Sequence, residues 1–306
     1  MINRVLIRLK VVQIVYAYYK NSGKSLKAAE DEVFFSLSKA YDLYNYMLLL
    51  MVGVTHYAAD RISFSSMKVR PTESDINPNL KFVNNRFIAQ LENNEQLTKF
   101  SEKSKLNWVD NSDFLRRLLD KIEESDIYKE YMASETSSYE EDKELWRKTY
   151  KNFVLENEEL DSLLEDISLY WNDDKFIVDT FVLKTIKRFS EKEGGQQLLP
   201  EYKDVADMEF ARSLFRNAVT NAELYREMMS DSSKNWDMSR LAFMDVVIMQ
   251  VALAEAMTFD DIPLSVTLNE YVEIAKHYST AKSGSFVNGL LDTITKKLCK
   301  EGRINK

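Results

Sequence analysis

A lysine, two serines and a phenylalanine stand together near the C-terminal end of the chain, in the segment Lys282-Ser283-Gly284-Ser285-Phe286. The apolar spacing after it predicts a helix over about 284–300, so the segment lies at a helix start, where unpaired backbone N–H groups favour a phosphate. Lys282 adds a full positive charge, and the Phe286 ring can stack on a base of single-stranded RNA. An ordinary N-cap at Ser283 and a core position for Phe286 explain the same residues. The residues alone leave both interpretations open.

A second set of polar side chains lies on the first predicted helix, which is apolar nearly all round and is therefore expected to be buried on most sides. Arg4 and Arg8 are four residues apart, so they share one face of this helix and can act together. Lys10 and Gln13 are three residues apart and lie on a different face.

Both ends of the chain are basic, whereas its middle is acidic. The 306 residues include 41 Lys or Arg and 49 Asp or Glu, a net charge of −8. Residues 1–29 have a net charge of +6 and residues 276–306 one of +5, which leaves −19 for residues 30–275. Two basic ends attract a polyanion if the fold brings them together. Basic termini that are merely solvated are the alternative.

Residues suited to catalysis or metal binding are scarce. His56, His277 and Cys299 are too few for a histidine metal site, a thiolate cluster or a disulfide framework, and no glycine-rich nucleotide loop is present. The carboxylates of residues 135–174 suit a solvated acidic face better than acid–base catalysis. We therefore expect no catalytic residue, no metal and no cofactor. Because no apolar run could cross a bilayer and Met1 does not open a signal peptide, we expect a cytoplasmic protein without a membrane partner.

The elements that would position these residues are all helices. With only 7 Gly and 4 Pro, the chain is too poor in turn residues to favour a sheet-rich fold. Ser25 is a suitable N-cap, and apolar residues from Val33 to Ala58 alternate steps of four and three. This pattern predicts a single helix over about 25–62 with a seam for close packing against another helix.

The rest of the chain divides into a poorly periodic part and further helices. Residues 66–112 lose periodicity and read as an extended connection with short helical pieces. Ser138 and Glu141 have the spacing of a capping box, which opens another helix. Apolar periodicity predicts helices over about 113–133, 202–230, 239–257, 265–277 and 284–300.

One sequence pattern occurs twice in the chain. Asn157-Glu158-Glu159-Leu160 is followed by Trp171 and an apolar segment at 178–183. Asn221-Ala222-Glu223-Leu224 is followed by Trp236 and an apolar segment at 244–249. This similarity indicates a helix-turn-helix unit present twice. Chance similarity between two amphipathic hairpins is the alternative.

Two dense motifs lie near the C-terminus. The first is Ile-Pro-Leu-Ser-Val-Thr-Leu-Asn-Glu-Tyr-Val-Glu-Ile-Ala-Lys at 262–276, and the second is Lys-Ser-Gly-Ser-Phe-Val-Asn-Gly-Leu-Leu-Asp at 282–292. In order and spacing they resemble the bacterial NusB antitermination family. Residues 240–255 look like the central helix of that family. Arg4-x-x-x-Arg8 followed by Gln13-x-x-Tyr16 resembles its basic first helix, although the arginines are sparser here.

The resemblance implies an all-α fold of NusB-like antiparallel helical bundles, with the first and last helices side by side so that the two basic ends form one patch. Residues 1–62 would supply the N-terminal helices and residues 200–306 the C-terminal bundle. Residues 63–199 would be a partly duplicated helical insertion that contains the extended connection and the repeat-like hairpin.

The resemblance also implies a function. A NusB-like protein binds boxA-type single-stranded RNA in ribosomal RNA leader transcripts, together with the ribosomal protein NusE, in the antitermination complex of RNA polymerase. The alternative is a non-enzymatic helical scaffold that binds protein partners through the insertion. The residues implied for RNA binding, with Lys10 added from the same basic helix, are Arg4, Arg8, Lys10, Gln13, Tyr16, Lys282, Ser283 and Phe286, and those on the NusE-facing helix are Asp245 and Glu255.

Overall fold

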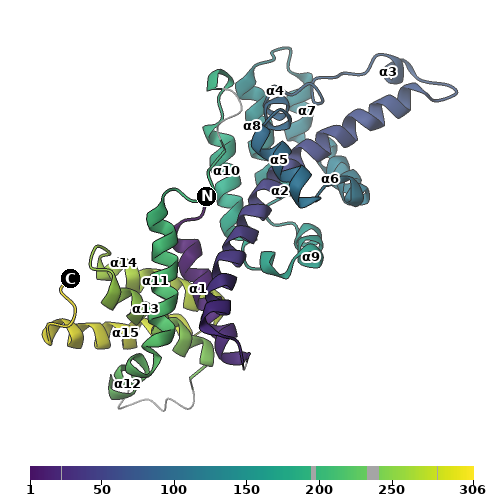
Figure 1. Cartoon of the computed structure of the whole chain (residues 1–306). Helices are drawn as coiled ribbons and strands as arrows, with labels where there is room; N and C mark the ends of the chain where they lie inside the picture. Colours follow the sequence, from purple (N-terminus) through teal and green to yellow (C-terminus); the bar gives the residue numbers. More distant parts are fainter. Residues whose placement is uncertain (22, 194–197, 233–240, 281) are drawn as a thin grey trace. The chain divides into compact units, whose positions relative to one another are not determined.

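The protein is described by a computed structural model that covers residues 1–21, 23–193, 198–232, 241–280 and 282–306 (Figure 1). Helices make up the regular structure of these ranges, and their one β-type pairing is an isolated bridge between Ile2 and Tyr202. The predicted all-α class is therefore confirmed. None of the described helices has the length and apolar character needed to span a membrane. The chain divides into two compact units: Lys39–Pro200 with Met1 forms unit 1, and Ile2–Ser38 with Glu201–Lys306 forms unit 2.

The long helix predicted from the alternating apolar pattern is α2, Leu26–Ser66. It starts as expected, because the Ser25 hydroxyl accepts a hydrogen bond from the Ala28 N–H at 3.1 Å. The first part of α2 belongs to unit 2 and the remainder to unit 1. The predicted seam is buried throughout, at Val33, Leu37, Ala40, Tyr44, Met47, Met51, Val54 and Ala58.

Unit 1 continues from α2 with short helices that begin at polar caps. In the poorly periodic stretch, the Asn85 and Asn94 side chains accept hydrogen bonds from backbone N–H groups of the helices that they open. The predicted capping box of Ser138 and Glu141 is confirmed by both of its hydrogen bonds. The helices of this unit are α3 (Glu73–Ile76), α4 (Arg86–Glu92), α5 (Glu95–Ser104), η1 (Val109–Asn111), α6 (Ser112–Glu124), α7 (Asp126–Ala133), α8 (Tyr139–Phe153), α9 (Glu158–Ile167), η2 (Leu169–Trp171), α10 (Lys175–Arg188) and η3 (Glu191–Glu193).

Aromatic side chains form part of the core of unit 1. The Tyr46 ring stacks on Trp108 with centroids 4.2 Å apart and on Trp171 with centroids 5.6 Å apart. Each indole N–H is satisfied, since Trp108 donates to the Tyr46 carbonyl and Trp171 to the Lys39 carbonyl. These contacts join α2 to two segments far along the chain.

Unit 2 is built around α13 (Phe243–Thr258), an almost entirely apolar helix that contacts the other helices of its bundle. A helix that is apolar on all sides is stable only when neighbours cover it completely. The Asp245 and Glu255 side chains are its buried acidic groups. The surrounding helices are α1 (Arg4–Lys20), α11 (Val205–Thr220), α12 (Ala222–Ser232), α14 (Leu264–Tyr278) and α15 (Ser283–Lys300).

The single helix predicted over about 202–230 is wrong. The structure has α11 and α12 in its place, and Asn221 between them has φ −104° and ψ 21°, outside the helical range. The last two predicted helices agree with α14 and α15 to within a residue. The helix predicted over 239–257 is α13, and residues 239 and 240 lie outside the described residues, as does Trp236 of the proposed repeat. The duplication therefore stays a prediction.

A buried lysine holds three elements of unit 1 together. The Lys175 ammonium, at the start of α10, donates to the carbonyls of Val154 and Leu155 beyond the end of α8, and it contacts Asp161 of α9 at 3.2 Å. It also lies 3.0 Å from the buried Asp179 carboxylate, one turn along α10. Burial raises the pKa of Asp179, although Lys175 opposes this shift. Lys175 thus satisfies several acceptors that would otherwise be buried without a donor.

A second buried ion pair lies in unit 2. The Arg8 guanidinium of α1 donates to both carboxylate oxygens of Glu255 on α13, through Nε and Nη2, each at 2.8 Å. The hydroxyls of Thr267 and Tyr271 on α14 donate to the same carboxylate at 2.9 and 3.0 Å. Burial disfavours the charged guanidinium, but hydrogen bonding to Glu255 and its charge outweigh this, so the pKa of Arg8 lies above its ordinary value. One carboxylate therefore connects three helices.

Replacing Lys175 by Met should lower the free energy of unfolding by about 3 kcal/mol, because the buried Asp179 loses its cation and keeps the Tyr150 hydroxyl, and the Val154 and Leu155 carbonyls lose their donor. Urea unfolding followed by tryptophan fluorescence measures this. The matched control is Lys99→Met, which removes an exposed lysine paired with Glu95 and should cost less than about 1 kcal/mol. Similar losses for the two variants would contradict this role of Lys175.

Replacing Arg8 by Met should cost about 3–5 kcal/mol in unfolding free energy, because the Glu255 carboxylate stays buried without its cation. The double variant Arg8→Met/Glu255→Leu should recover much of that loss, since neither charge is then left alone. Urea denaturation of the two single variants and the double variant gives the coupling. The control is Arg4→Met, whose side chain is 38% exposed and should matter little. Additive losses in the double variant would rule out the coupling.

Candidate nucleic-acid interface

The end of α1 and the start of α15 both pack against the N-terminal end of α13, on opposite faces of that helix. The Phe243 ring, on the first residue of α13, lies 5.4 Å from the Tyr16 ring, and the Lys20 ammonium lies 4.7 Å from the Phe243 centroid. One half-turn further along α13, Asp245 accepts a hydrogen bond of 2.8 Å from the Ser283 hydroxyl of α15. A cation and aromatic rings of α1 therefore meet the same helix end as the loop before α15.

The start of α15 is open to solvent where the sequence predicts a phosphate site. Lys282 and Ser285 are exposed, Phe286 is half-buried, and no side chain caps this helix. A cavity of about 550 Å³ adjoins them. Its lining residues are Ser232, Lys282, Ser285, Phe286, Gly289, Leu290 and Thr293. Exposed charge, a helix N-terminus and an aromatic side chain beside a cavity are the groups that a nucleotide needs.

Ser283 serves the fold in a way that neither sequence interpretation describes. Its hydroxyl accepts from the Thr280 N–H at 3.0 Å and contacts Asp245 on α13, and it is buried. The Asp245 carboxylate lies in the first turn of α13, where the helix dipole stabilises a negative charge. Through its hydrogen bond to Asp245, Ser283 fixes the start of α15 against α13, next to Lys282.

The basic residues at the start of α1 lie away from this place. Arg8 and Lys10 are buried, and Arg8 is held by Glu255 near the other end of α13. Arg4 is partly exposed, lies 3.5 Å from Asp261 and has its guanidinium 5.0 Å from the Phe210 ring centroid. Arg4 and Tyr16 are separated by about 18 Å along the helix. The structure therefore divides the predicted RNA-binding residues between the two ends of α1.

The remaining predicted residues are less accessible. Gln13 and Tyr16 are half-buried, and the carboxylates of Asp245 and Glu255 are buried with partners inside unit 2. In this arrangement the two acidic residues hold neighbouring helices. Contacts of these residues with RNA or NusE stay predictions.

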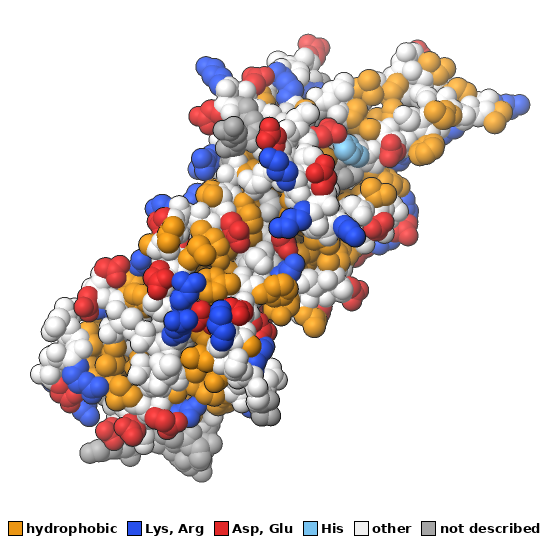
Figure 2. All heavy atoms as spheres, viewed as in Figure 1, with side chains coloured by type: hydrophobic (Ala, Val, Ile, Leu, Met, Phe, Trp, Pro, Cys, Tyr) orange, Lys and Arg blue, Asp and Glu red, His pale blue; other side chains and the backbone are white. Residues whose placement is uncertain are grey.

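The sequence counted Lys20 only as part of the basic N-terminal charge, and it did not point to Phe243 or Arg226. Lys20 follows Tyr16 by one helical turn, a spacing that could have drawn attention to it. Phe243 and Arg226 give no such signal, because their roles depend on tertiary packing. The Arg226 guanidinium lies 5.0 Å from the Tyr19 ring, which in turn lies 6.1 Å from the Phe243 ring. Figure 2 shows basic and acidic side chains interspersed on the face in view, so local clusters matter more than net charge.

Comparisons with known proteins agree with the fold. The NusB family profile matches residues 177–296. The transcription antitermination protein NusB of Salinibacter ruber is 35% identical over 132 residues, which cover 41% of this chain and 82% of that protein. NusB of Dictyoglomus turgidum is 35% identical over 129 residues, covering 40% of this chain and 90% of that protein. NusB of Syntrophotalea carbinolica is 38% identical over 111 residues, which cover 36% of this chain and 71% of that protein. No solved structure matches.

The matched range begins in α10, inside the segment 63–199 that the sequence predicts to be an insertion. It does not include residues 1–62, so their assignment to the N-terminal helices of the family stays a prediction. A relative at 35% identity is nevertheless matched over four-fifths of its own length. The chain therefore belongs to the NusB family.

Proposed function

We propose that this protein is a transcription antitermination factor of the cytoplasm that binds boxA-type single-stranded RNA of ribosomal RNA leader transcripts. We further propose that it acts with the ribosomal protein NusE in the antitermination complex of RNA polymerase. The names of its relatives and its family membership support the antitermination role. The observation that carries the RNA proposal is the exposed Lys282 beside Phe286 and a cavity at the start of α15, with Lys20 and Tyr16 packed against the same end of α13.

The proposed binding mode divides the work between cations and rings. Lys282 and Lys20 would neutralise phosphates, while backbone N–H groups in the first turn of α15 would donate to the oxygens of one phosphate. The Phe286 ring would stack on a base in the adjoining cavity, since stacking is the usual way to hold an unpaired nucleotide. Tyr16 and Phe243 offer a second aromatic surface. This arrangement suits a single strand, because in a duplex the faces of each base are already covered by the neighbouring stacked bases.

The distribution of charge between the units means that nucleic acid is attracted to local clusters of cations and not to the chain as a whole. Unit 2 holds 19 basic and 19 acidic side chains, whereas residues 39–200 hold 22 basic and 30 acidic ones. Unit 1 therefore repels nucleic acid, and unit 2 attracts it only where its cations gather. An acidic chain also suits NusE if that ribosomal protein is basic, since complementary charge raises the rate of encounter. Asp245 and Glu255 would support the NusE-facing helix from inside.

Phosphate contacts and base stacking should separate in a salt titration. Lys282→Ala and Lys20→Ala should each weaken RNA binding and reduce the slope of log affinity against log salt by about 0.7, the value expected per single-strand phosphate. Phe286→Ala should weaken binding by about tenfold while the slope stays unchanged, because stacking releases no counterion. Fluorescence anisotropy with labelled boxA RNA at several KCl concentrations, with and without NusE, measures both quantities.

The control for the lysine variants is Lys99→Ala, an exposed lysine of unit 1 that should leave affinity and slope unchanged. Arg4→Ala tests the other end of α1, because its side chain is accessible and Arg8 variants would disturb the core. If neither Lys282→Ala nor Lys20→Ala alters the slope, the proposed site is wrong.

A further inference from the structure

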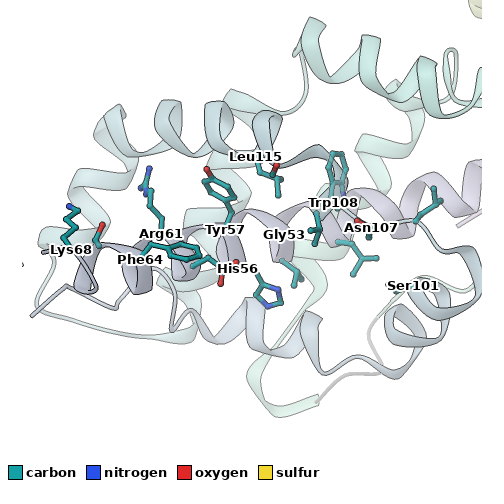
Figure 3. Close-up of a pocket in the computed structure, with 17 residues that line it drawn as sticks. Gly53, His56, Tyr57, Arg61, Phe64, Lys68, Ser101, Asn107, Trp108 and Leu115 are labelled. Atoms are coloured by element: carbon teal, nitrogen blue, oxygen red, sulfur yellow. The ribbon is translucent and has the colours of Figure 1, made fainter. Parts of the chain in front are cut away.

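A groove of about 550 Å³ runs along the C-terminal half of α2 in unit 1 (Figure 3). One face of α2 forms one wall, from Leu49 to Ser65, and residues of α5, η1, the start of α6 and the segment 106–108 form the other. Sixteen helical steps from Leu49 to Ser65 correspond to about 24 Å. This is longer than a single small ligand requires and equals the length of a helix of about four and a half turns.

The floor of the groove is apolar, whereas charged side chains stand along its edges. Gly53 lies against Trp108 so closely that a Cβ atom there would stand 2.9 Å from the Trp108 Cβ, which is why the indole can lie flat on α2. Tyr57 and Leu115 line the middle of the groove (Figure 3). Towards the end of α2, Phe64 is 73% exposed, and Val109 on the opposite wall is 78% exposed. Figure 2 shows hydrophobic side chains gathered along this end of α2. Exposed apolar patches of this kind mark binding surfaces.

One charged group of the groove has no ion-pair partner in the described part of the chain. Arg61 is paired with Asp120 and Glu123, and Lys68 is paired with Asp75 at 2.9 Å. Asp60, which lines the groove and is exposed, has no ion pair or hydrogen bond within the described part of the chain. The groove therefore offers an apolar floor with one free carboxylate, on a unit of net charge −8.

We propose that this groove binds a cationic amphipathic α-helix of a partner protein. The apolar face of the helix would pack on Tyr57, Phe64 and Val109, and a Lys or Arg at its edge would pair with Asp60. The negative charge of unit 1 attracts such a helix. The same charge disfavours a second copy of this chain, which would bring another acidic unit to the surface. This interaction does not depend on RNA binding, because the groove lies in unit 1 and the RNA site in unit 2.

The test uses the full chain and two labelled 18-residue helical peptides, acetylated and amidated at their ends. Both carry the same Leu and Phe face, one with four Lys at the edges and the other with four Glu. Fluorescence anisotropy should show the Lys peptide binding at least about tenfold more tightly than the Glu peptide. Phe64→Glu should reduce Lys-peptide binding by about tenfold or more, and Asp60→Lys should remove or reverse the preference between the peptides.

Matched controls distinguish peptide binding in the groove from nonspecific binding to exposed apolar or charged residues elsewhere on unit 1. Leu169→Glu changes a 77% exposed apolar residue of unit 1 outside the groove, and Glu135→Lys reverses an exposed charge elsewhere on it. Both should leave peptide binding unchanged. Equal binding of the two peptides, or equal effects of Leu169→Glu and Phe64→Glu, would overturn the proposal. A dimer in sedimentation that Phe64→Glu abolishes would also overturn it, since a second copy would then occupy the groove. RNA binding by Phe64→Glu, measured in parallel, reports on unit 2 alone.

Discussion

The buried pair of Arg8 and Glu255 is the interaction on which unit 2 depends. It joins α1 to α13 across 247 positions of sequence, and the Thr267 and Tyr271 hydroxyls extend it to α14. Removal of two charges from water costs much of what their attraction gives, so the pair contributes mainly by specifying which helix faces which. An apolar helix such as α1 could pack on many surfaces, and the Glu255 carboxylate, with Glu270 of α14 at 3.7 Å from the same guanidinium, selects the one that it takes.

The second buried carboxylate of α13 has the corresponding role at the other end of the helix. Asp245 receives the Ser283 hydroxyl and so fixes the start of α15, just as Glu255 fixes α1 and α14. Between these two groups α13 is apolar except for the buried Gln250, whose amide donates to the Tyr19 hydroxyl of α1 at 2.9 Å and to the Ala218 carbonyl of α11 at 2.7 Å. The proposed RNA site follows from this arrangement, since Lys282 stands next to a residue whose side chain is anchored inside the bundle.

Local patterns predicted much of the fold, whereas partners distant in sequence were beyond them. The α2 seam, the Ser138 capping box and the last two helices depend on spacing within a few turns, and each was predictable. The break at Asn221 was not, because asparagine is tolerated within helices and its local hydrogen bonds decide the outcome. For Arg8, the apolar neighbours predicted burial of the helix but could not identify Glu255 as its partner. The position of Phe243 beside Tyr16 likewise depends on the assembled bundle, and the Asp60 groove depends on the packing of α6 and η1.

The division of unit 2 into two segments of sequence has a consequence for synthesis. Residues 2–38 leave the ribosome before all of unit 1, and Glu255 follows Arg8 by 247 residues. At translation rates of about 5–20 residues per second, Glu255 is synthesised roughly 12–50 s after Arg8 of the apolar first helix. During that interval the apolar surface of α1 stays exposed and can bind chaperones, and unit 1 has time to fold before unit 2 is complete.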